Sequence, residues 1–228
     1  MSKKIRLGII GLGAEGGMYA EFLNEGRVNN MEIGAICDIL PEKKEAADGY
    51  GVPFYADYRE MITSGDVDAV VTTVPHYLHP EMGIFALNNG VHALVEKPVG
   101  VYTKQANELI DLAATKPELQ FGVFFNQRTN ELYRDLKAIM ASGELGNLRH
   151  TSWIITTWWR PQGYYTQSDW RATWGGEGGG VLVNQAPHQL DLWQWICGTP
   201  ERVFARAEFG FKRDIAVEDE VNALVSFP

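Results

Sequence analysis

A glycine-rich segment near the start of the chain has the spacing of a dinucleotide-binding loop. Residues Gly11-Leu12-Gly13-Ala14-Glu15-Gly16 form a G-x-G-x-x-G pattern between an apolar run and a stretch of helical periodicity. In such a loop the first glycine permits a tight turn, the second lets the backbone approach a pyrophosphate, and the third lets the helix pack on the strand. The helix start adds unpaired N–H groups and the positive end of its dipole. We therefore expect the phosphates of a nucleotide to bind at Gly11, Gly13, Ala14, Glu15 and Gly16.

An acidic residue follows this loop at the distance typical of a dinucleotide site. Asp38 lies 22 residues after Gly16, at the end of the next apolar run. A carboxylate there accepts hydrogen bonds from the adenosine ribose of NAD and repels the 2′-phosphate of NADP. Ile39 and Leu40 come next, so no arginine follows that would bind this phosphate. We expect NAD in preference to NADP. The alternative role of Asp38 is to cap the following helix.

A lysine stands where another predicted strand ends, in the sequence Glu96-Lys97-Pro98. Ligands of an open parallel sheet bind beyond the carboxyl ends of its strands, which places Glu96 and Lys97 beside the cofactor. The Lys97 ammonium would hydrogen-bond a reacting hydroxyl and stabilise charge on its oxygen as the hydroxyl becomes a carbonyl. Pro98 would fix the backbone, for instance through a cis bond. An ordinary surface lysine is the alternative interpretation.

A second polar group lies in the later half of the chain. Asn184 and His188 are four residues apart, which puts them on one face of a helix. A neutral histidine is suited to remove a hydroxyl proton near pH 7. A capping or packing histidine is the alternative. Asp191 would extend the pair to a loosely spaced metal-ligand set, but nothing else in the chain completes such a set, so we expect no metal.

An aromatic loop precedes this helix. Flat apolar rings beside polar donors suit the C–H faces and hydroxyls of sugars and cyclitols, whereas aromatic clusters also form cores and subunit interfaces. The sequence leaves both interpretations open. The residues concerned are Trp158, Trp159, Arg160, Tyr164, Tyr165, Trp170, Arg171 and Trp174.

The elements that must position these residues alternate between β and helical patterns over residues 1–125. The strands are almost wholly apolar, as in a parallel sheet that helices cover on both faces. Strands are expected at Ile5–Ile10, Glu32–Cys37, Ala69–Thr73, His92–Val95 and Gln120–Phe125. Helices are expected at Glu15–Asn24, Pro41–Tyr50, Tyr58–Ser64, Pro80–Asn89 and Lys104–Ala114. This order predicts the α/β class, with a doubly wound Rossmann sheet as the first domain.

Residues 126–228 have a different pattern, which predicts a partial α+β domain with a mainly antiparallel sheet. The expected helices are Asn130–Ser142 and Val183–Ile196, and Pro187 either kinks the second helix or marks its first turn. The expected strands are Leu148–Trp158 and two near Arg202–Phe209 and Glu220–Phe227, while Arg160–Glu177 is expected to be a loop.

The last expected strand stops at Pro228, and a lone pair of strands cannot bury a face unaided. We therefore expect the second domain to be incomplete. Either the chain is truncated or another subunit completes the sheet, and we favour truncation.

Composition excludes several classes of partner. Twenty-nine acidic and 20 basic residues give a net charge of −9, which argues against binding to nucleic acid or an anionic membrane. No apolar run approaches the roughly 18 residues of a membrane span, and the apolar stretch near the N-terminus is too short for a signal peptide. Cys37 and Cys197 lie far apart without a paired spacing, which suits the reducing cytoplasm.

Taken together, these residues resemble the Gfo/Idh/MocA family of NAD(P)-dependent oxidoreductases. The motifs that carry the resemblance are GLGAEG, the acid at Asp38, the tripeptide Glu96-Lys97-Pro98 and the segment GGGVLVNQAPHQLD. The resemblance implies an N-terminal Rossmann domain and a C-terminal α/β domain whose large, mostly antiparallel sheet usually extends well past this point. It also implies a homo-oligomer, often a dimer or tetramer.

The resemblance assigns roles to particular residues. It implies that Lys97 and His188 are the catalytic lysine and histidine, and that Arg128 contacts substrate. Many relatives carry aspartate where this chain has Asn184, which can orient a substrate but cannot relay a proton. With Trp158 and Arg171 of the aromatic loop, these residues form the expected substrate site.

The activity implied is reversible hydride transfer between the nicotinamide and a ring hydroxyl of a sugar, sugar derivative or inositol. Two alternatives come from other classes. Some family members use NAD for transient oxidation during glycoside cleavage, and a non-catalytic NAD-binding protein is the second alternative.

Overall fold

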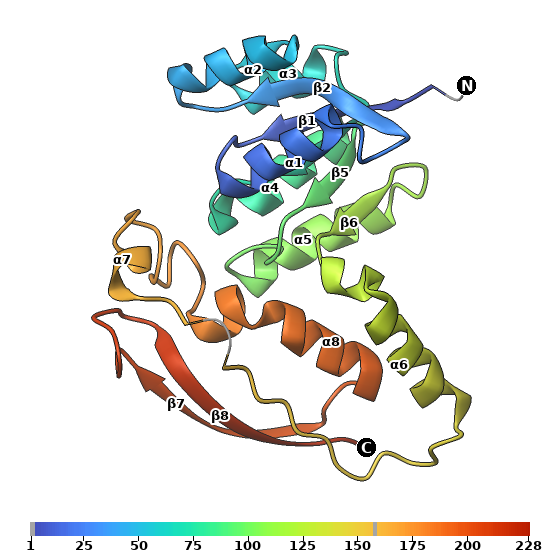
Figure 1. The fold of residues 1–228 in the computed structure, drawn as a ribbon, viewed down its shortest axis with the longest axis vertical. Helices are drawn as coiled ribbons and strands as arrows, with labels where there is room; N and C mark the ends of the chain where they lie inside the picture. Colours follow the sequence, from blue (N-terminus) through green and yellow to red (C-terminus); the bar gives the residue numbers. More distant parts are fainter. Residues whose placement is uncertain (1–2, 157–158) are drawn as a thin grey trace. The chain divides into compact units, whose positions relative to one another are not determined.

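The computed structural model describes residues 3–156 and 159–228 (Figure 1). The chain divides into two units, Met1–Phe124 (unit 1) and Phe125–Pro228 (unit 2). No helix in the described part of the chain is long and apolar enough to cross a membrane.

Unit 1 is built on a six-stranded sheet whose paired strands all run parallel. The strand order is β3-β2-β1-β4-β5-β6. The strands are β1 (Ile5–Ile10), β2 (Met31–Cys37), β3 (Phe54–Tyr55), β4 (Ala69–Thr72), β5 (His92–Val95) and β6 (Phe121–Val123). The five expected strands are all present, and only the two-residue β3 was not predicted.

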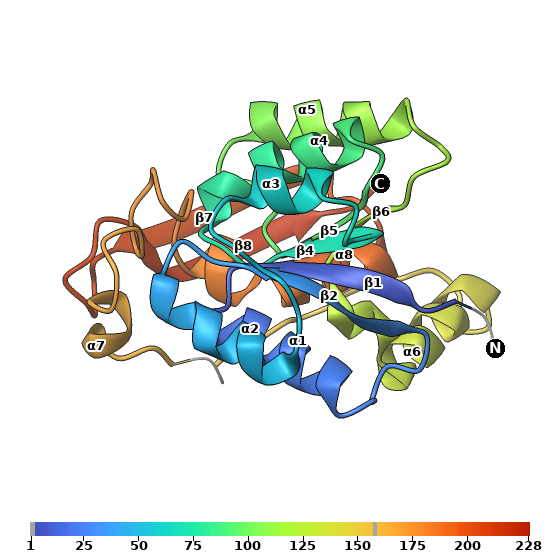
Figure 2. The ribbon, with the colours of Figure 1, turned by 90° about the horizontal axis from the view of Figure 1, so that it is seen from above.

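Helices cover both faces of this sheet. Figure 2 shows α1 and α2 on one side and α3, α4 and α5 on the other. The helices are α1 (Ala14–Asn24), α2 (Lys44–Tyr50), α3 (Tyr58–Thr63), α4 (His79–Asn88) and α5 (Thr103–Ala114), with short 3₁₀ turns η1 (Pro41–Lys43) and η2 (His76–Leu78). The predicted doubly wound α/β fold is thus confirmed.

The core of unit 1 lies in two apolar layers, one on each face of the sheet. Adjacent residues of β4 enter different layers: Val70 packs with Met61 and Leu87, whereas Val71 packs with Ile9 and Ile36. A strand that is buried on both faces must be apolar at consecutive positions, which explains the unbroken apolar runs in the sequence. Burial of each such large aliphatic side chain contributes about 1.5–3 kcal/mol.

The strand order changes direction at β1, which lies between β2 and β4. The loops that leave β1 and β4 therefore diverge at their carboxyl ends, which is where such sheets bind ligands. Backbone hydrogen bonds hold these ends together: Gly11 N–H donates to Cys37 O over 2.8 Å, and Thr73 N–H donates to Ile10 O over 2.9 Å.

Unit 2 combines helices with a two-stranded antiparallel sheet. Strands β7 (Arg202–Phe209) and β8 (Glu218–Ser226) pair from Arg202↔Ser226 to Phe209↔Glu218. The helical elements are the 3₁₀ turn η3 (Asn126–Thr129), α6 (Glu131–Ser142), α7 (Gln162–Tyr165), the π-helical turn η4 (Val181–Gln185) and α8 (Pro187–Cys197). Pro187 is the first residue of α8, so it marks the start of the α-helix.

One expected strand, Leu148–Trp158, is not observed. Residues 148–156 have no regular structure, and 157–158 lie outside the described residues. In the part of the chain that the structure describes, a cavity of about 1120 Å³, lined in part by Ile154, Trp193 and Leu224, runs along this segment. Ile154 is 84% exposed. A β-favouring pattern becomes a strand only where its backbone pairs with a neighbour, and no backbone hydrogen bond joins the described residues 148–156 to β7 or β8.

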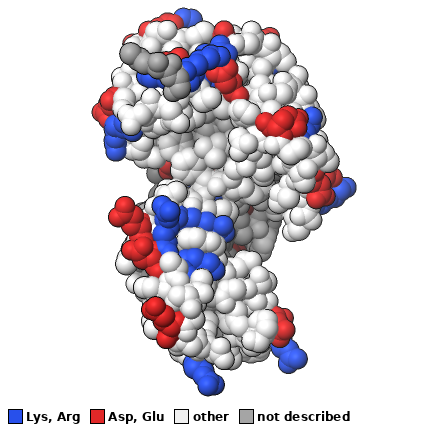
Figure 3. All heavy atoms as spheres, turned by 90° about the vertical axis from the view of Figure 1, so that its right-hand side faces the viewer, with Lys and Arg blue, Asp and Glu red and all other residues white. Residues whose placement is uncertain are grey.

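The surface carries charges of both signs. On the face drawn in Figure 3, basic and acidic side chains occur in small groups separated by uncharged surface. Neither sign covers this face.

Candidate active site

The glycine loop has the geometry that its spacing predicts. Gly11 adopts a φ of 92°, and a Cβ on it would lie 2.8 Å from the Thr73 carbonyl oxygen. A Cβ on Gly16 would lie 2.0 Å from the Gly11 carbonyl oxygen, so only glycine lets α1 start this close to the loop. A Cβ on Gly13 would meet no heavy atom within 4 Å. The first and third glycines therefore serve the protein's own packing, and the second leaves room for a ligand.

The beginning of α1 faces solvent and offers its N–H groups. Gly13, Ala14 and Glu15 are exposed, and Gly13 is the N-cap, without a side chain to satisfy the first N–H groups. Thr73 supports the loop from the end of β4, because its hydroxyl donates to Gly11 O over 2.5 Å. These residues fit the pyrophosphate of a dinucleotide, which needs backbone donors and a helix N-terminus.

Asp38 is fixed beside this loop. Its Oδ2 accepts a hydrogen bond from Leu12 N–H over 2.7 Å, and its Oδ1 accepts one from Leu40 N–H over 2.9 Å. Leu40 is the N-cap of η1, and its own apolar side chain makes no capping hydrogen bond. The carboxylate thus ties the phosphate loop to the end of β2 and to the residue that precedes η1.

Glu96 is buried at the end of β5, and its neighbours explain why. It accepts hydrogen bonds from the Tyr19 hydroxyl of α1 and, over 3.1 Å, from Lys97 N–H. The Tyr19 ring stacks on Phe124 with 5.0 Å between centroids. Burial raises the pKa of both Glu96 and Tyr19. Glu96 therefore anchors the backbone before Lys97 to the helix of the phosphate loop. The sequence offered no sign of Tyr19, whose partner lies 77 residues away.

His79 holds the backbone on the other side of Lys97. The Lys97–Pro98 bond is cis. The fully buried His79 ring lies with Nδ1 2.8 Å from Pro98 O and Nε2 2.9 Å from Val74 O. Burial lowers the pKa of His79, so the ring is neutral near pH 7 and donates to one of these two oxygens. His79 thus links the segments that follow β4 and β5. It was not predicted, because a histidine at a helix start resembles a surface residue.

The glycine triplet in unit 2 packs against the sheet. A Cβ on Gly180 would lie 2.0 Å from the Glu218 backbone oxygen of β8. The Glu218 carboxylate accepts a hydrogen bond from Leu182 N–H over 3.1 Å. This close approach places η4, which carries Asn184, on the edge of β8. Single π-helical turns are frequent at functional sites because they re-aim the side chains that follow.

Asn184 belongs to a partly buried polar network centred on Glu177. Its Nδ2 donates to Glu177 Oε1 and, over 3.3 Å, to the Tyr164 hydroxyl. Arg171 donates to that same hydroxyl over 2.6 Å and lies 3.7 Å from Glu177 Oε1. Glu177 is 0% exposed. The structure thus brings together two predicted substrate residues, Asn184 and Arg171, through a carboxylate to which the sequence assigned no role.

His188 is the second residue of α8, and its ring stands edge-on to Phe125, with 6.1 Å between centroids. One turn further, Asp191 receives two hydrogen bonds from Arg128, from Nε over 2.7 Å and from an Nη over 2.5 Å. This bidentate pairing raises the pKa of Arg128. Asp191 is therefore engaged by an arginine, and no group of three potential metal ligands occurs within residues 3–156 and 159–228.

The aromatic loop is stacked with arginines. The Arg171 guanidinium lies over Tyr164 at 4.4 Å and Trp170 at 4.7 Å from the ring centroids, and Arg213 lies over Trp159 at 4.1 Å. Tyr165 is buried, whereas Trp159 and Trp174 are exposed. The loop therefore contributes both to packing and to exposed aromatic surface. Trp158, predicted as a substrate residue, lies outside the described residues.

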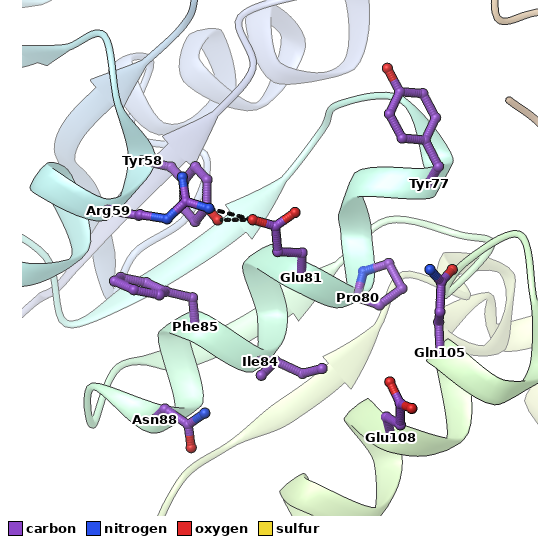
Figure 4. A pocket seen from close by; sticks show the side chains of 10 residues that line it. All are labelled: Tyr58, Arg59, Tyr77, Pro80, Glu81, Ile84, Phe85, Asn88, Gln105 and Glu108. Carbon is purple, nitrogen blue, oxygen red and sulfur yellow. Dashed lines mark hydrogen bonds and ion pairs between the residues drawn. The ribbon is translucent and has the colours of Figure 1, made fainter.

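A pocket of about 370 Å³ lies among α3, α4 and α5, on one face of the unit 1 sheet (Figure 4). Arg59 and the Tyr58 hydroxyl both bind the Glu81 carboxylate within it. These polar groups satisfy one another, and the pocket contains none of the predicted site residues. It lies apart from the loop and strand ends described above.

Comparison with known proteins places this geometry in a family. Residues 5–125 match the model of the GFO/IDH/MocA oxidoreductase family, NAD-binding Rossmann fold, and residues 133–228 match that of the GFO/IDH/MocA C-terminal domain. The chain is 30% identical over 200 residues to the uncharacterized oxidoreductase YdgJ of Escherichia coli (88% of this chain, 56% of that protein). It is 31% identical over 205 residues to an inositol 2-dehydrogenase of Corynebacterium glutamicum (87% and 56%). The chain thus spans about half the length of these curated relatives.

A solved structure resembles both the fold and the sequence. It is the WlbA dehydrogenase of Chromobacterium violaceum in complex with NADH and UDP-GlcNAcA, with a TM-score of 0.86 and 30% identity, covering 99% of this chain and 64% of that one. The two family models together match most of the chain. The chain belongs to the GFO/IDH/MocA oxidoreductase family, and its first unit is that family's NAD-binding Rossmann domain.

Proposed function

We propose that the protein is an NAD-dependent oxidoreductase that transfers a hydride between the nicotinamide and a ring hydroxyl of a sugar, sugar derivative or inositol. The observation that carries the proposal is the Asp38 carboxylate, hydrogen-bonded to Leu12 N–H at the phosphate loop. In that place it accepts hydrogen bonds from ribose hydroxyls and repels a 2′-phosphate, which favours NAD over NADP.

The proposed roles follow from the chemistry of each side chain. NAD, when bound, supplies the hydride acceptor for the alcohol carbon. Lys97 hydrogen-bonds the reacting oxygen and stabilises charge on it. His188 takes the hydroxyl proton, which a neutral imidazole does near pH 7. Asn184 orients the substrate, and Glu96 and His79 hold the backbone on either side of Lys97.

The substrate class rests on two kinds of support. Relatives named above include an inositol 2-dehydrogenase and a dehydrogenase crystallised with a sugar nucleotide. The exposed rings of Trp159 and Trp174, beside Arg171 in the same loop, suit the C–H faces and hydroxyls of such rings. Arg128 and Trp158 complete the proposed substrate site.

We further propose a cytoplasmic homo-oligomer that binds neither nucleic acid nor membrane. Both cysteines are free, which suits a reducing compartment. Phe204 and Leu224, which pair across the β7–β8 sheet, are largely exposed, and exposed apolar side chains on a sheet face are common at subunit contacts.

The test is a substrate panel. The full-length protein is mixed with NAD and a series of sugars, sugar nucleotides and inositols, and the absorbance of NADH is followed. Formation of NADH with one chemical class supports the proposal and names the substrate. Release of a free sugar without NADH would indicate a glycoside hydrolase, and NAD binding without any product would indicate a non-catalytic protein. Either result would overturn the proposal.

A further inference from the structure

Glu177 is a fully buried carboxylate at the centre of the polar network in unit 2. Its Oε2 accepts a hydrogen bond from Ala172 N–H over 2.8 Å, and its Oε1 accepts one from Asn184 Nδ2. Arg171 provides a positive charge 3.7 Å from Oε1. Burial of a carboxylate is costly unless charges and donors compensate it, and here a guanidinium and two N–H donors do so.

The chemistry of this contact dictates how the Asn184 amide is turned. An ionised carboxylate accepts hydrogen bonds but cannot donate, so Asn184 must present its NH₂ group to Glu177. The same NH₂ group also donates a hydrogen bond to the Tyr164 hydroxyl, which accepts a second hydrogen bond from Arg171. The contact with Glu177 thus runs through Nδ2, and Oδ1, the other terminal atom of the amide, is not the atom that makes it.

We propose that Glu177 is a positioning residue that fixes Asn184 with its carbonyl oxygen toward the substrate, where it accepts a hydrogen bond from a substrate hydroxyl. Asn184 lies in η4, and the proposed base His188 is the second residue of α8, which begins after the single residue Ala186. This role rests on the proposed dehydrogenase function. It also accounts for asparagine in this place: the negative charge that an aspartate would carry is supplied one contact away, by Glu177.

If this is so, the carboxylate at position 177 and the amide at position 184 should be exchangeable without loss of function. In Glu177→Gln, one former acceptor becomes an NH₂ group. If it faces residue 184, Asn184 must turn its carbonyl inward and present NH₂ to the substrate. In Asn184→Asp, two carboxylates oppose each other without a hydrogen between them. In the double variant, the introduced glutamine accepts from Ala172 N–H and donates to the introduced aspartate, whose other oxygen again faces the substrate as an acceptor.

A purely structural role for Glu177 makes a different prediction. Ala172 has a φ of 52°, unusual for a residue with a side chain, and Glu177 stabilises this turn through its contact with Ala172 N–H. If that were its only role, both variants with glutamine in place of Glu177 would share one defect, whatever stood at position 184. Exchange with residue 184 would then restore nothing.

The experiment measures kcat and KM for the wild type, the two single variants and the double variant, with the substrate found in the panel. Each single substitution should lower kcat by at least about tenfold, leaving the KM for NAD unchanged. The double variant should recover kcat to within about threefold of the wild type. Glu201→Gln, which removes an exposed carboxylate from the same unit, is the matched control and should change nothing.

Three outcomes overturn the inference. The first is an unchanged kcat in folded Glu177→Gln. The second is a double variant that is no more active than the less active single variant. The third is failure of the double variant to fold, because the exchange should preserve both the charge and the hydrogen bond between the two side chains. If Glu177→Gln alone fails to fold, the double variant and Asn184→Asp carry the test. A wild type silent with every substrate overturns the proposed function itself, and a wild type that turns over while the exchange fails overturns only the role of Glu177.

Discussion

The carboxylate of Asp38 accepts a hydrogen bond from the backbone N–H of Leu12 over 2.7 Å. The residue proposed to distinguish NAD from NADP is therefore held against the loop proposed to bind their common pyrophosphate. This one contact would couple the position of a bound ribose to that of the phosphates. It also gives Asp38 a structural partner that its place in the sequence did not reveal.

Asp38→Ala is accordingly expected to weaken NAD binding by at least about tenfold, because a charged acceptor for the ribose hydroxyls is lost. The preference for NAD over NADP should narrow, and the addition of Ile39→Arg should shift it toward NADP. Calorimetric titration with both cofactors measures this. Asp111→Ala, a matched change on the exposed side of α5, should leave both affinities as they are. An unaltered ratio of NAD to NADP affinity in Asp38→Ala would refute the assignment.

The glycine loop allows a matched comparison of two substitutions. Gly16→Ala would place a Cβ 2.0 Å from a backbone oxygen and should lower the free energy of unfolding by about 1–3 kcal/mol. Gly13→Ala adds a Cβ that meets no protein atom, so the loss should stay below about 1 kcal/mol, while NAD affinity falls because the backbone can no longer approach the pyrophosphate. Urea unfolding and NAD titration separate the two effects. Equal destabilisation by both changes would contradict the roles given to the loop.

His79 should make the stability of unit 1 depend on pH. Its pKa in the folded protein is lowered by burial from 6.5. Below about pH 6.5 the unfolded chain takes up a proton that the folded ring does not, so the unfolded state binds more protons and stability falls as pH falls. His79→Gln lacks this titration. The advantage of the wild type over His79→Gln in the free energy of unfolding should therefore shrink between about pH 8 and about pH 5.

Urea unfolding of the wild type and His79→Gln across this pH range measures the difference in their free energies of unfolding. Titration of Glu96 and Lys97, which both proteins contain, cancels in this difference to a first approximation. His150→Gln, at an exposed position in unit 2, serves as the control and should show no such trend. A difference between wild type and His79→Gln that stays constant or grows with acidity would exclude a buried neutral His79.

Much of unit 1 could be predicted because its signals are local. Strands β1 and β5 have the bounds that the sequence predicts, and Gly16 and Asp38 are recognisable from spacing alone. β3 escaped prediction because two residues are too few to form a pattern. The expected strand at Leu148–Trp158 was wrong in its described part because alternation expresses only a preference, and the described residues of the segment do not pair with a strand.

The supporting residues of the site could not be predicted for a different reason. Tyr19 and His79 act through partners that are distant in sequence or belong to the backbone, and no motif marks such contacts. Glu177 lies seven residues before Asn184, but a loop and a π-helical turn join the two, so neither helical nor strand periodicity relates their side chains. The residues proposed for catalysis, Lys97, Asn184 and His188, remain predictions that mutagenesis must test.

We propose that Lys97 acts on the reacting oxygen of the substrate and not on the cofactor. The most direct measurement compares the wild type with Lys97→Met in a single turnover, with NAD affinity determined by calorimetry on the same samples. We predict that Lys97→Met binds NAD with nearly the affinity of the wild type and forms no NADH from the substrate of the panel. NADH formation at the wild-type rate in Lys97→Met would show that Lys97 does not act on the reacting oxygen.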